Sequence, residues 1–167
     1  MRRLLVILAV VFVGGVSALV GQAPDRPVAY AAEQAAAGRI EIEKNSFGAC
    51  TDCHTKTLAG RNGDAAELPP ISSLPADYQK LISGNGGKVP DLVGPKFMTR
   101  WSGRRTKDLI AEFQVRFAPP ASRLSEETRL NLIAYILQAN GALPGAQPLT
   151  MATDVEIRTL FPIGPPR

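Results

Sequence analysis

Three residues that can bind a cofactor or a metal lie within five positions of one another. Cys50 and Cys53 are the two cysteines of the chain and His54 is its one histidine, in the order Cys50-Thr51-Asp52-Cys53-His54. On a helix, residues three apart lie on the same face, so both sulfurs can bond to one group. Two cysteines separated by two residues and followed by histidine form the attachment signature of a c-type haem. In that signature the sulfurs form thioethers and the histidine ligates the iron.

Three other uses of this pentapeptide have weaker support in the sequence. A redox-active dithiol normally lies in a βαβ pattern, which the sequence does not show. A zinc site would need a carboxylate as fourth ligand, because the sequence has no other cysteine or histidine. A disulfide across two residues closes too small a loop to stabilise much. The sequence therefore predicts one covalent haem c, with His54 as the iron ligand.

The first residues have the pattern of a secretory signal. Met1-Arg2-Arg3 is positively charged, and residues 4–20 form an apolar run. The small residues of Ala29-Tyr30-Ala31 favour cleavage after Ala31, with Val16-Ser17-Ala18 as an earlier candidate. The alternative is an uncleaved membrane anchor, because about 17 apolar residues reach the lower limit for spanning a bilayer. Either way, we expect the folded part to be periplasmic or otherwise exported, or anchored in the membrane and facing the periplasm.

The charge of the chain does not indicate a nucleic-acid partner. The net charge is +4, and removal of residues 1–31, with three arginines and one aspartate, leaves +2. Two haem propionates would bring the mature protein close to neutral, so we expect no nucleic acid among the partners. A membrane contact is expected only if the N-terminal segment is uncleaved. Five basic residues lie close together, with no acidic residue among positions 96–107: Lys96, Arg100, Arg104, Arg105 and Lys107. Such a run is usually a solvated face, and the alternative here is a site for a haem propionate or an acidic partner.

Three segments are expected along the chain: a signal peptide at 1–31, a domain at 32–145 and a proline-rich C-terminal extension at 146–167. A helix-forming run starts at Ala32, and Gly38 within it would let another helix approach closely. Residues 57–95 are rich in glycine and proline, which predicts loops around one short helix at residues 75–83, with Pro75 at its first position. Another short helix is expected to start near Thr106.

The pattern of the last helix is the clearest. Ser125 is suited to cap its start, two glutamates follow at the positive end of the helix dipole, and Gly141 is suited to its end. Apolar residues on one face are expected to pack against the first helix near Gly38: Leu130, Ile133, Ala134 and Leu137. No β-alternation holds for long, so the predicted fold class is all-α.

Motifs beyond the pentapeptide resemble those of class I c-type cytochromes, the small monohaem cytochrome c domains. Pro90-Asp91-Leu92-Val93-Gly94 is similar to a proline-x-leucine-x-glycine segment of that family, Phe97 and Trp101 follow it, and residues 134–141 resemble the family's ending. The resemblance covers residues 35–145 and is closest to cytochromes that accompany periplasmic quinoprotein dehydrogenases. It implies an all-α, cytochrome c-like fold, in which N- and C-terminal helices cross and short helices and loops wrap one haem.

The resemblance also implies roles for individual residues. Cys50 and Cys53 would hold the haem, and His54 would ligate its iron. The Pro90 carbonyl would accept a hydrogen bond from the second ring nitrogen of His54. Trp101 would pack on the haem edge and point its indole N–H at a propionate. Ordinary turn and core roles are the alternatives for Pro90 and Trp101.

Two departures from the family pattern concern the far face of the haem and the segment after the motif. The family places a methionine, the usual sixth iron ligand, just before two prolines, where this chain has Ala118. Met98 and Met151 lie outside that loop, so the sixth ligand is left open. The stretch between the pentapeptide and Pro90 is longer than usual, and could fold over the haem edge or form a partner surface.

The sequence leads to one main functional hypothesis and two alternatives. The main one is an exported one-electron carrier that cycles between Fe(III) and Fe(II) and serves a periplasmic dehydrogenase or a respiratory chain. Its partners would be a dehydrogenase as donor and an oxidase or cytochrome as acceptor. It is not expected to be an enzyme, because its one histidine is committed to iron. The alternatives are a five-coordinate haem protein, as a gas sensor or weak peroxidase, and a fixed subunit of a dehydrogenase complex that makes contact through residues 144–167.

Overall fold

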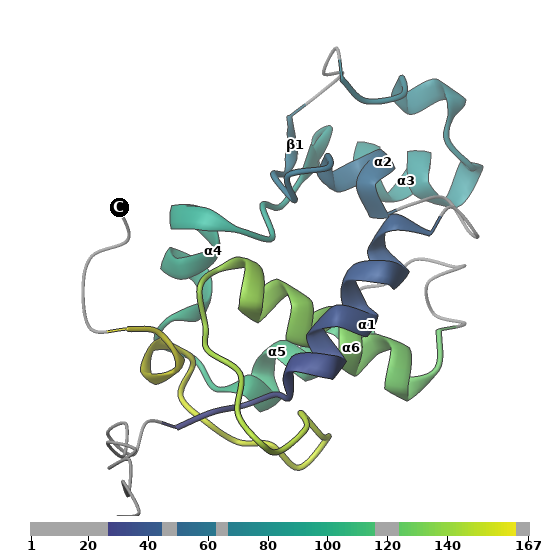
Figure 1. Cartoon of the computed structure of the whole chain (residues 1–167). Coiled ribbons are helices and arrows are strands. Elements are labelled where there is room, and N and C mark those ends of the chain that lie inside the picture. The colour runs from purple at the N-terminus through teal and green to yellow at the C-terminus, as the bar shows by residue number, and fades with distance from the viewer. Residues whose placement is uncertain (1–26, 45–49, 63–66, 116–123, 163–167) are drawn as a thin grey trace, which may run out of the picture.

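The computed structural model describes residues 27–44, 50–62, 67–115 and 124–162 of the chain (Figure 1). This part is mostly helical, in agreement with the predicted all-α class, and two short strands are the departure from it. The α-helices are α1 (Ala32–Glu43), α2 (Cys50–His54), α3 (Ala76–Gly84), α4 (Gly94–Trp101), α5 (Thr106–Val115) and α6 (Glu126–Ala139). The shorter elements are the 3-10 helices η1 (Ile71–Ser73) and η3 (Ile157–Leu160) and the antiparallel strands β1 (Arg61–Asn62) and β2 (Lys88–Val89).

Helices α1 and α6 cross, as the glycine in the first helix predicts. A Cβ atom at Gly38 would lie 1.9 Å from the backbone oxygen of Asn131, so the backbones meet with no room for a side chain. The apolar face of α6 is buried at this crossing and in the adjoining core: Leu130, Leu132, Ile133, Ala134, Ile136 and Leu137. The crossing of these two helices therefore depends on the absence of a side chain at position 38.

The ends of α6 are fixed by the residues that its sequence indicates. Ser125 is the N-cap, and its Oγ accepts a hydrogen bond of 3.0 Å from the backbone N–H of Thr128. Glu126 and Glu127 lie in the first turn, where the helix dipole favours negative charge. Gly141, directly after the C-cap, has a φ of +92°, which an L residue with a side chain rarely adopts. Local sequence thus indicates both boundaries of the helix.

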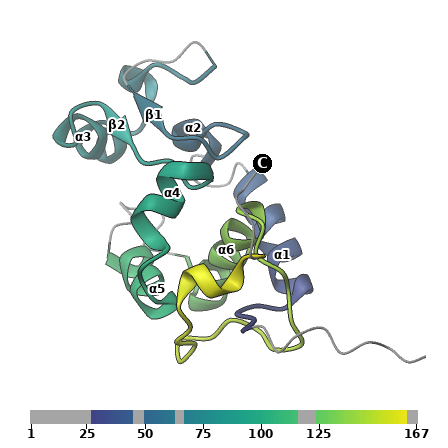
Figure 2. The same ribbon diagram turned by 90° about the vertical axis from the view of Figure 1, so that its left-hand side faces the viewer.

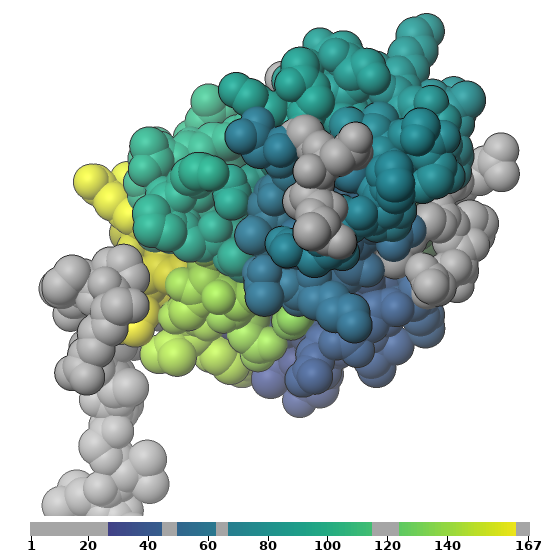
Figure 3. All heavy atoms as spheres, turned by 90° about the horizontal axis from the view of Figure 1, so that it is seen from above, coloured from purple at the N-terminus to yellow at the C-terminus, as the bar shows by residue number. Residues whose placement is uncertain are grey.

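Two groups of elements stand on either side of α4. In Figures 1 and 2, α1, α5 and α6 lie together in the lower part, and α2, α3 and the β1–β2 pair lie in the upper part. Figure 3 shows the molecule from above, with the upper elements in blue and teal facing the viewer. None of the helices in the described part of the chain has both the length and the hydropathy needed to cross a membrane.

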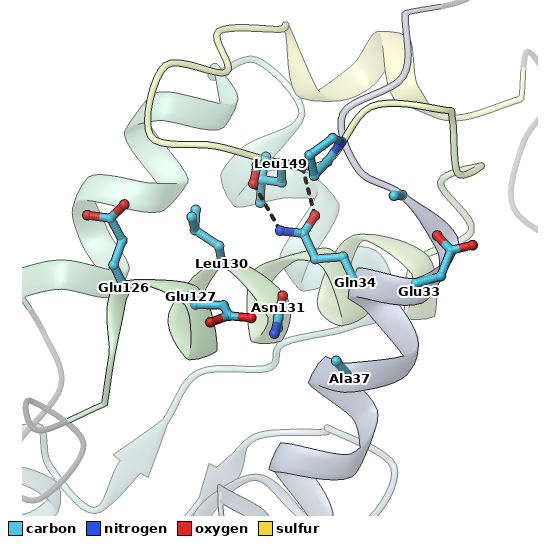
Figure 4. A pocket seen from close by; sticks show the side chains of 10 residues that line it. Glu33, Gln34, Ala37, Glu126, Glu127, Leu130, Asn131 and Leu149 are labelled. Carbon is cyan, nitrogen blue, oxygen red and sulfur yellow. Dashed lines mark hydrogen bonds between the residues drawn. The ribbon is translucent and has the colours of Figure 1, made fainter.

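The residues that follow α6 join the main core of the domain. Leu149, Ile157 and Leu160 are each at most 1% exposed and pack in the same cluster as the buried face of α6. The side-chain amide of Gln34 on α1 holds the backbone of Leu149 through two hydrogen bonds, of 2.9 and 2.7 Å (Figure 4). Thr106 is fully buried and bonds to the backbone of residues 153 and 155. Residues 146–160 are therefore built into the domain that was expected to end at 145.

A short arm before α1 is also part of the core. Tyr30 is 0% exposed and Ala29 is 2% exposed. The Tyr30 hydroxyl donates a 2.5 Å hydrogen bond to the carbonyl of Ala142, and the N–H of Gly145 donates a 2.8 Å bond to the Tyr30 carbonyl. Cleavage after Ala31 would remove these core residues, whereas the alternative cleavage after Ala18 falls outside the described residues and would leave them in place.

The middle of the chain differs from its sequence-based description in two places. Helix α3 starts at Ala76 with Pro75 as its N-cap, one residue later than expected, and Leu81 on it is 50% exposed. Residues 94–101 form α4, although a glycine and a proline stand at its start. Gly94 has a φ of +80° and Pro95 occupies the first turn, where a missing N–H costs nothing. These two residues begin the helix instead of interrupting it.

Candidate functional site

The pentapeptide forms the short helix α2 and faces a large cavity. Cys50, Cys53 and His54 all line this cavity, whose volume is about 1,380 Å³. Pockets for ordinary small molecules have volumes of about 300–1,000 Å³. The space beside the motif is therefore large enough for a ligand of greater size than most metabolites.

The walls of the cavity come from nearly every helix of the described chain. The apolar lining includes residues from α3, α4, α5 and α6 and from the segment after β2: Ile82, Leu92, Phe97, Phe113, Leu132 and Ile136. Most of these side chains are also buried or partly buried members of the protein core. The cavity is thus an apolar chamber with the two thiols and the imidazole on one wall.

His54 is held in the neutral state that a metal ligand requires. Burial lowers its pKa to about 4, an effect that the Pro90 carbonyl and the charge of Asp91 partly oppose. Its Nδ1 is buried and has no hydrogen bond within the described part of the chain. A buried and unsatisfied ring nitrogen is rare and calls for an explanation. The Pro90 carbonyl acts on the imidazole closely enough to raise its pKa, which fits the role implied for it, as orienting partner of the ligand.

Cys50 and Cys53 form no disulfide in the structure, and burial raises the pKa of both thiols. Nearby Arg61 opposes this effect at Cys53. Reactive dithiols have a lowered pKa, because the thiolate is the nucleophile. The environment of Cys50 and Cys53 is therefore the opposite of that of a redox-active pair. Among the described residues, no group of three or more His, Cys, Asp and Glu side chains is arranged to hold a metal ion, as a zinc site would need.

A strained turn directly after the motif brings the Pro90 segment to His54. Thr55 and Leu58 both have positive φ, of 54° and 61°, which is costly for residues with a branched side chain. The carbonyl of Leu58 then accepts a 3.0 Å hydrogen bond from the N–H of Leu92. A Cβ at Gly60 would lie 2.2 Å from the carbonyl oxygen of Val89, so the two segments touch through backbone. Strain of this kind gathers at functional sites.

Trp101 lies on the wall of the cavity. It is 4% exposed, lines the cavity and packs against Phe97 at 6.4 Å between ring centroids. Two guanidinium groups stack on its ring, Arg100 at 5.1 Å and Arg104 at 5.2 Å from the centroid. The indole is therefore well positioned to contact a flat ligand in the cavity, with positive charge beside it.

Neither candidate methionine lines the cavity. Met98 packs against the main core, and the sulfur of Met151 accepts a 3.5 Å hydrogen bond from Gln114 at the surface. Ala118, which stands where the family has its methionine, lies outside the described residues. No methionine of the described chain is thus placed to reach a group bound to His54.

The basic run is largely neutralised within the chain. Lys96 pairs with Asp91 at 3.0 Å, and Arg100 pairs with Glu112 at 2.5 Å. Arg105 and Lys107 both pair with Asp154 in the segment after α6. All five cations are exposed, as a solvated face predicts, but four of them pair with carboxylates, so the run is not an open basic surface.

Two features of the site have no signal in the spacing of the sequence. Arg61 is 2% exposed, lines the cavity and donates hydrogen bonds to the carbonyls of Asp52 and Pro69. It ties the motif helix to the loop that precedes η1. The Arg100–Glu112 pair joins α4 to α5 at the cavity wall. Both depend on the fold, because the partners lie on different elements or loops of the chain.

A comparison of the chain with protein-family models, curated proteins and solved structures gave no match. Its function is inferred from the residues around the cavity.

Proposed function

We propose that this chain is an exported monohaem c-type cytochrome that carries one electron at a time. Its fold would be the cytochrome c-like arrangement, with α1 and α6 as the crossing helices and one haem between the upper and lower groups of elements. The carrier would serve a periplasmic dehydrogenase or a respiratory chain, and its partners would be redox proteins. It would not be an enzyme in its own right.

One observation carries this proposal. Cys50, Cys53 and a neutral, buried His54 lie together on the wall of an apolar cavity of about 1,380 Å³. Two thiols within one turn suit attachment to two neighbouring vinyl groups, and a neutral imidazole suits an axial iron bond. A haem bound here would supply reversible one-electron chemistry between Fe(III) and Fe(II).

The residues around the cavity would hold the group and set its environment. Cys50 and Cys53 would anchor it, and the Pro90 carbonyl would fix the ring of His54 through Nδ1. Phe97 and the other apolar lining residues would exclude water, and burial is one of the factors that set a haem potential. Trp101 would pack on an edge, with its indole N–H directed to a propionate. None of these roles requires a catalytic side chain.

Mass spectrometry of the exported protein under denaturing conditions tests the proposal. We expect the mass of the polypeptide plus one haem, because thioether bonds survive denaturation. Replacement of Cys50 and Cys53 by Ala should abolish the added mass. Asp52→Asn within the same motif is the matched control and should retain it. A haem that extracts completely into acidic solvent would contradict covalent attachment.

A second form of this function has an observation of its own. Because neither Met98 nor Met151 lines the cavity, a haem bound there would lack a thioether as sixth ligand. The iron would then be open to a small ligand, as in a gas-binding protein or a weak peroxidase. The remaining alternative, a fixed subunit of a dehydrogenase complex that makes contact through residues 144–167, has less support. Leu149, Ile157 and Leu160 of this segment are buried in the domain itself.

Carbon monoxide binding to the reduced protein separates these forms. We expect rapid binding and a shifted absorption spectrum, with Met98→Leu and Met151→Leu variants behaving like the parent. A sulfur-to-iron charge-transfer band that is present in the parent and lost in one variant would identify that methionine as the ligand. Such a result would leave the electron carrier as the function and exclude the open site.

A further inference from the structure

We propose that the N-terminal segment of this chain stays attached as a membrane anchor and that one uncharged face of the domain rests on the lipid bilayer. This arm face is formed by exposed residues before α1 and after α6: Pro27, Val28, Leu143, Pro144 and Ala146. The inference rests on the proposed export and is independent of the haem.

The two large apolar side chains of the arm face are carried by segments that pair with each other. Val28 is 37% exposed and Leu143 is 52% exposed. A Cβ atom at Gly145 would lie 2.2 Å from Cγ2 of Val28, so the Val28 side chain packs directly on the backbone two residues after Leu143. A parallel bridge between Ala31 and Gly145 fixes this arrangement. Both side chains are therefore presented by one connected piece of structure.

The segments that carry the arm face have no charged side chain. Residues 27–31 and 140–153 contain no Asp, Glu, Lys or Arg, although 20% of the chain is charged. Exposed apolar surface marks a contact with a protein or a membrane. A charged group resists transfer from water into an apolar medium, so an uncharged surface suits contact with lipid.

The chain that leads to the arm face identifies the bilayer as its occupant. Residues 4–20 form an apolar run of about the length that can span a bilayer, and Arg2 and Arg3 before it favour the cytoplasmic side. The seven peptide steps from Val20 to Pro27 span at most about 25 Å. A retained anchor therefore keeps Val28 close to the lipid. Retention also leaves Tyr30 in the core, from which cleavage after Ala31 would remove it.

The location of the arm face leaves the motif side of the molecule free. Figures 1 and 2 show the arm and the segment after α6 at the lower end of the molecule, and α2 and α3 in the upper part. A domain that rests on the bilayer through the arm face therefore directs the upper elements away from the lipid. A redox protein could then reach them without displacing the membrane contact.

Maleimide labelling of single added cysteines in the full chain tests the membrane contact. Leu143→Cys and its matched control Ile40→Cys place thiols at positions of nearly equal exposure, 52% and 56%. Ile40 lies on α1, about 12 Å along the helix axis from Ala32. In vesicles of phosphatidylethanolamine and phosphatidylglycerol, a water-soluble maleimide should label Leu143→Cys at least about tenfold more slowly than Ile40→Cys, because lipid covers only the first position. The parent chain gives the background from its own cysteines.

The anchor itself is tested by the N-terminus of the exported protein. We expect its intact mass to include residues 1–26, and we expect the protein to stay in the membrane fraction after an alkaline carbonate wash. A protein that is released by the wash and starts after Ala18 would overturn the anchor.

The other outcomes separate the possible occupants of the arm face. Equal labelling of the two variants in vesicles would overturn the membrane contact. Slow labelling of Leu143→Cys without lipid, in the form that starts at residue 27, would also overturn it, and the mass of a dimer in solution would then assign the face to a second copy of the chain. If Leu143→Cys does not fold, Val28→Cys lies on the same face and should be labelled slowly in vesicles, and labelling as fast as that of Ile40→Cys would refute the contact.

Failure of this inference can be told apart from failure of the proposed function. A protein with covalent haem but without the anchor leaves the electron carrier in place and overturns the inference. An anchored protein without covalent haem does the reverse. A domain that stays on the cytoplasmic side of the membrane overturns both.

Discussion

Burial decides the chemical state of the groups on the cavity wall. With a pKa near 4, His54 is neutral at pH 7, and its ring can offer a lone pair. Burial also keeps the thiols of Cys50 and Cys53 protonated, since it raises their pKa values. In the proposed function, addition of each S–H group across a vinyl bond would need no oxidant, so reduced thiols are the form that attachment would require. The same desolvation thus prepares all three residues.

Tyr30 is the residue whose burial predicts a pH dependence. Burial raises its pKa to about 12, against about 10 in an unfolded chain, so folding favours the neutral phenol. The resulting stability is complete below pH 10 and is lost as the pH rises from about 10 to 12. Urea unfolding of the parent and Tyr30→Phe should show a smaller loss over this range in the variant. At pH 7 the variant should be about 1–2 kcal/mol less stable, because the Ala142 carbonyl loses its donor. Parallel pH profiles for the two proteins would contradict this assignment.

The part of the site that lies within one short stretch of sequence could be predicted. The spacing of Cys50, Cys53 and His54 identifies them as candidate ligands, and all three line the cavity. Arg100 could not be paired with Glu112 from the sequence, because their meeting depends on the angle between α4 and α5. Arg61 could not be identified either, since its burial is created by the loop around it.

At the scale of elements, the α1–α6 crossing is the contact that organises the lower part of the molecule. Gly38→Ala would place a methyl group against the backbone of Asn131, which cannot yield as a flexible side chain can. Overpacking of this kind should lower the free energy of unfolding by about 1–3 kcal/mol. Gly84→Ala is the matched control, because no atom lies within 4 Å of a Cβ at that position. It should cause no loss, and a gain of up to about 1 kcal/mol would be ordinary. Equal unfolding midpoints for the two variants would mean that the helices can separate at little cost.

The sequence predicts well the elements that have recognisable capping residues at both ends. α6 has Ser125 and Gly141 at its boundaries, and both do in the structure what their types indicate. α4 was not predicted, because glycine and proline more often interrupt a helix, whereas Gly94 and Pro95 begin this one. The β1–β2 pair has two residues in each strand, too few for any alternation to show. Such strands exist because the turn after His54 brings the two segments together.

At the scale of the whole molecule, both ends of the described chain close over the same core. The arm before α1 pairs with the segment after α6 through a parallel bridge between Ala31 and Gly145. The later residues of that segment run back to the α4–α5 corner, where Ile157 donates its N–H to the carbonyl of Arg104 at 2.9 Å. Composition alone described these residues as a signal boundary and a proline-rich extension. Their packing could not be predicted, because outside η3 these segments form no helix or strand whose apolar face could be found from residue spacing. They bury their apolar residues only against the other elements.

The arm leads to a prediction about the N-terminus of the protein, if it is exported as we propose. Cleavage after Ala31 would remove Tyr30 and Ala29 from the core and leave the Ala142 carbonyl and the Gly145 N–H without these partners. Truncation of a buried aromatic residue to alanine alone costs about 3–5 kcal/mol. We therefore expect N-terminal sequencing of the exported protein to find a start at or before residue 28. A mature form that starts at residue 32 should be less stable to urea by at least about 3 kcal/mol than one that starts at residue 27. Forms that start at residues 24 and 27 are the control pair and should unfold together. An exported protein that starts at residue 32 and unfolds at the same urea concentration as the longer form would show that the arm is not part of the native core.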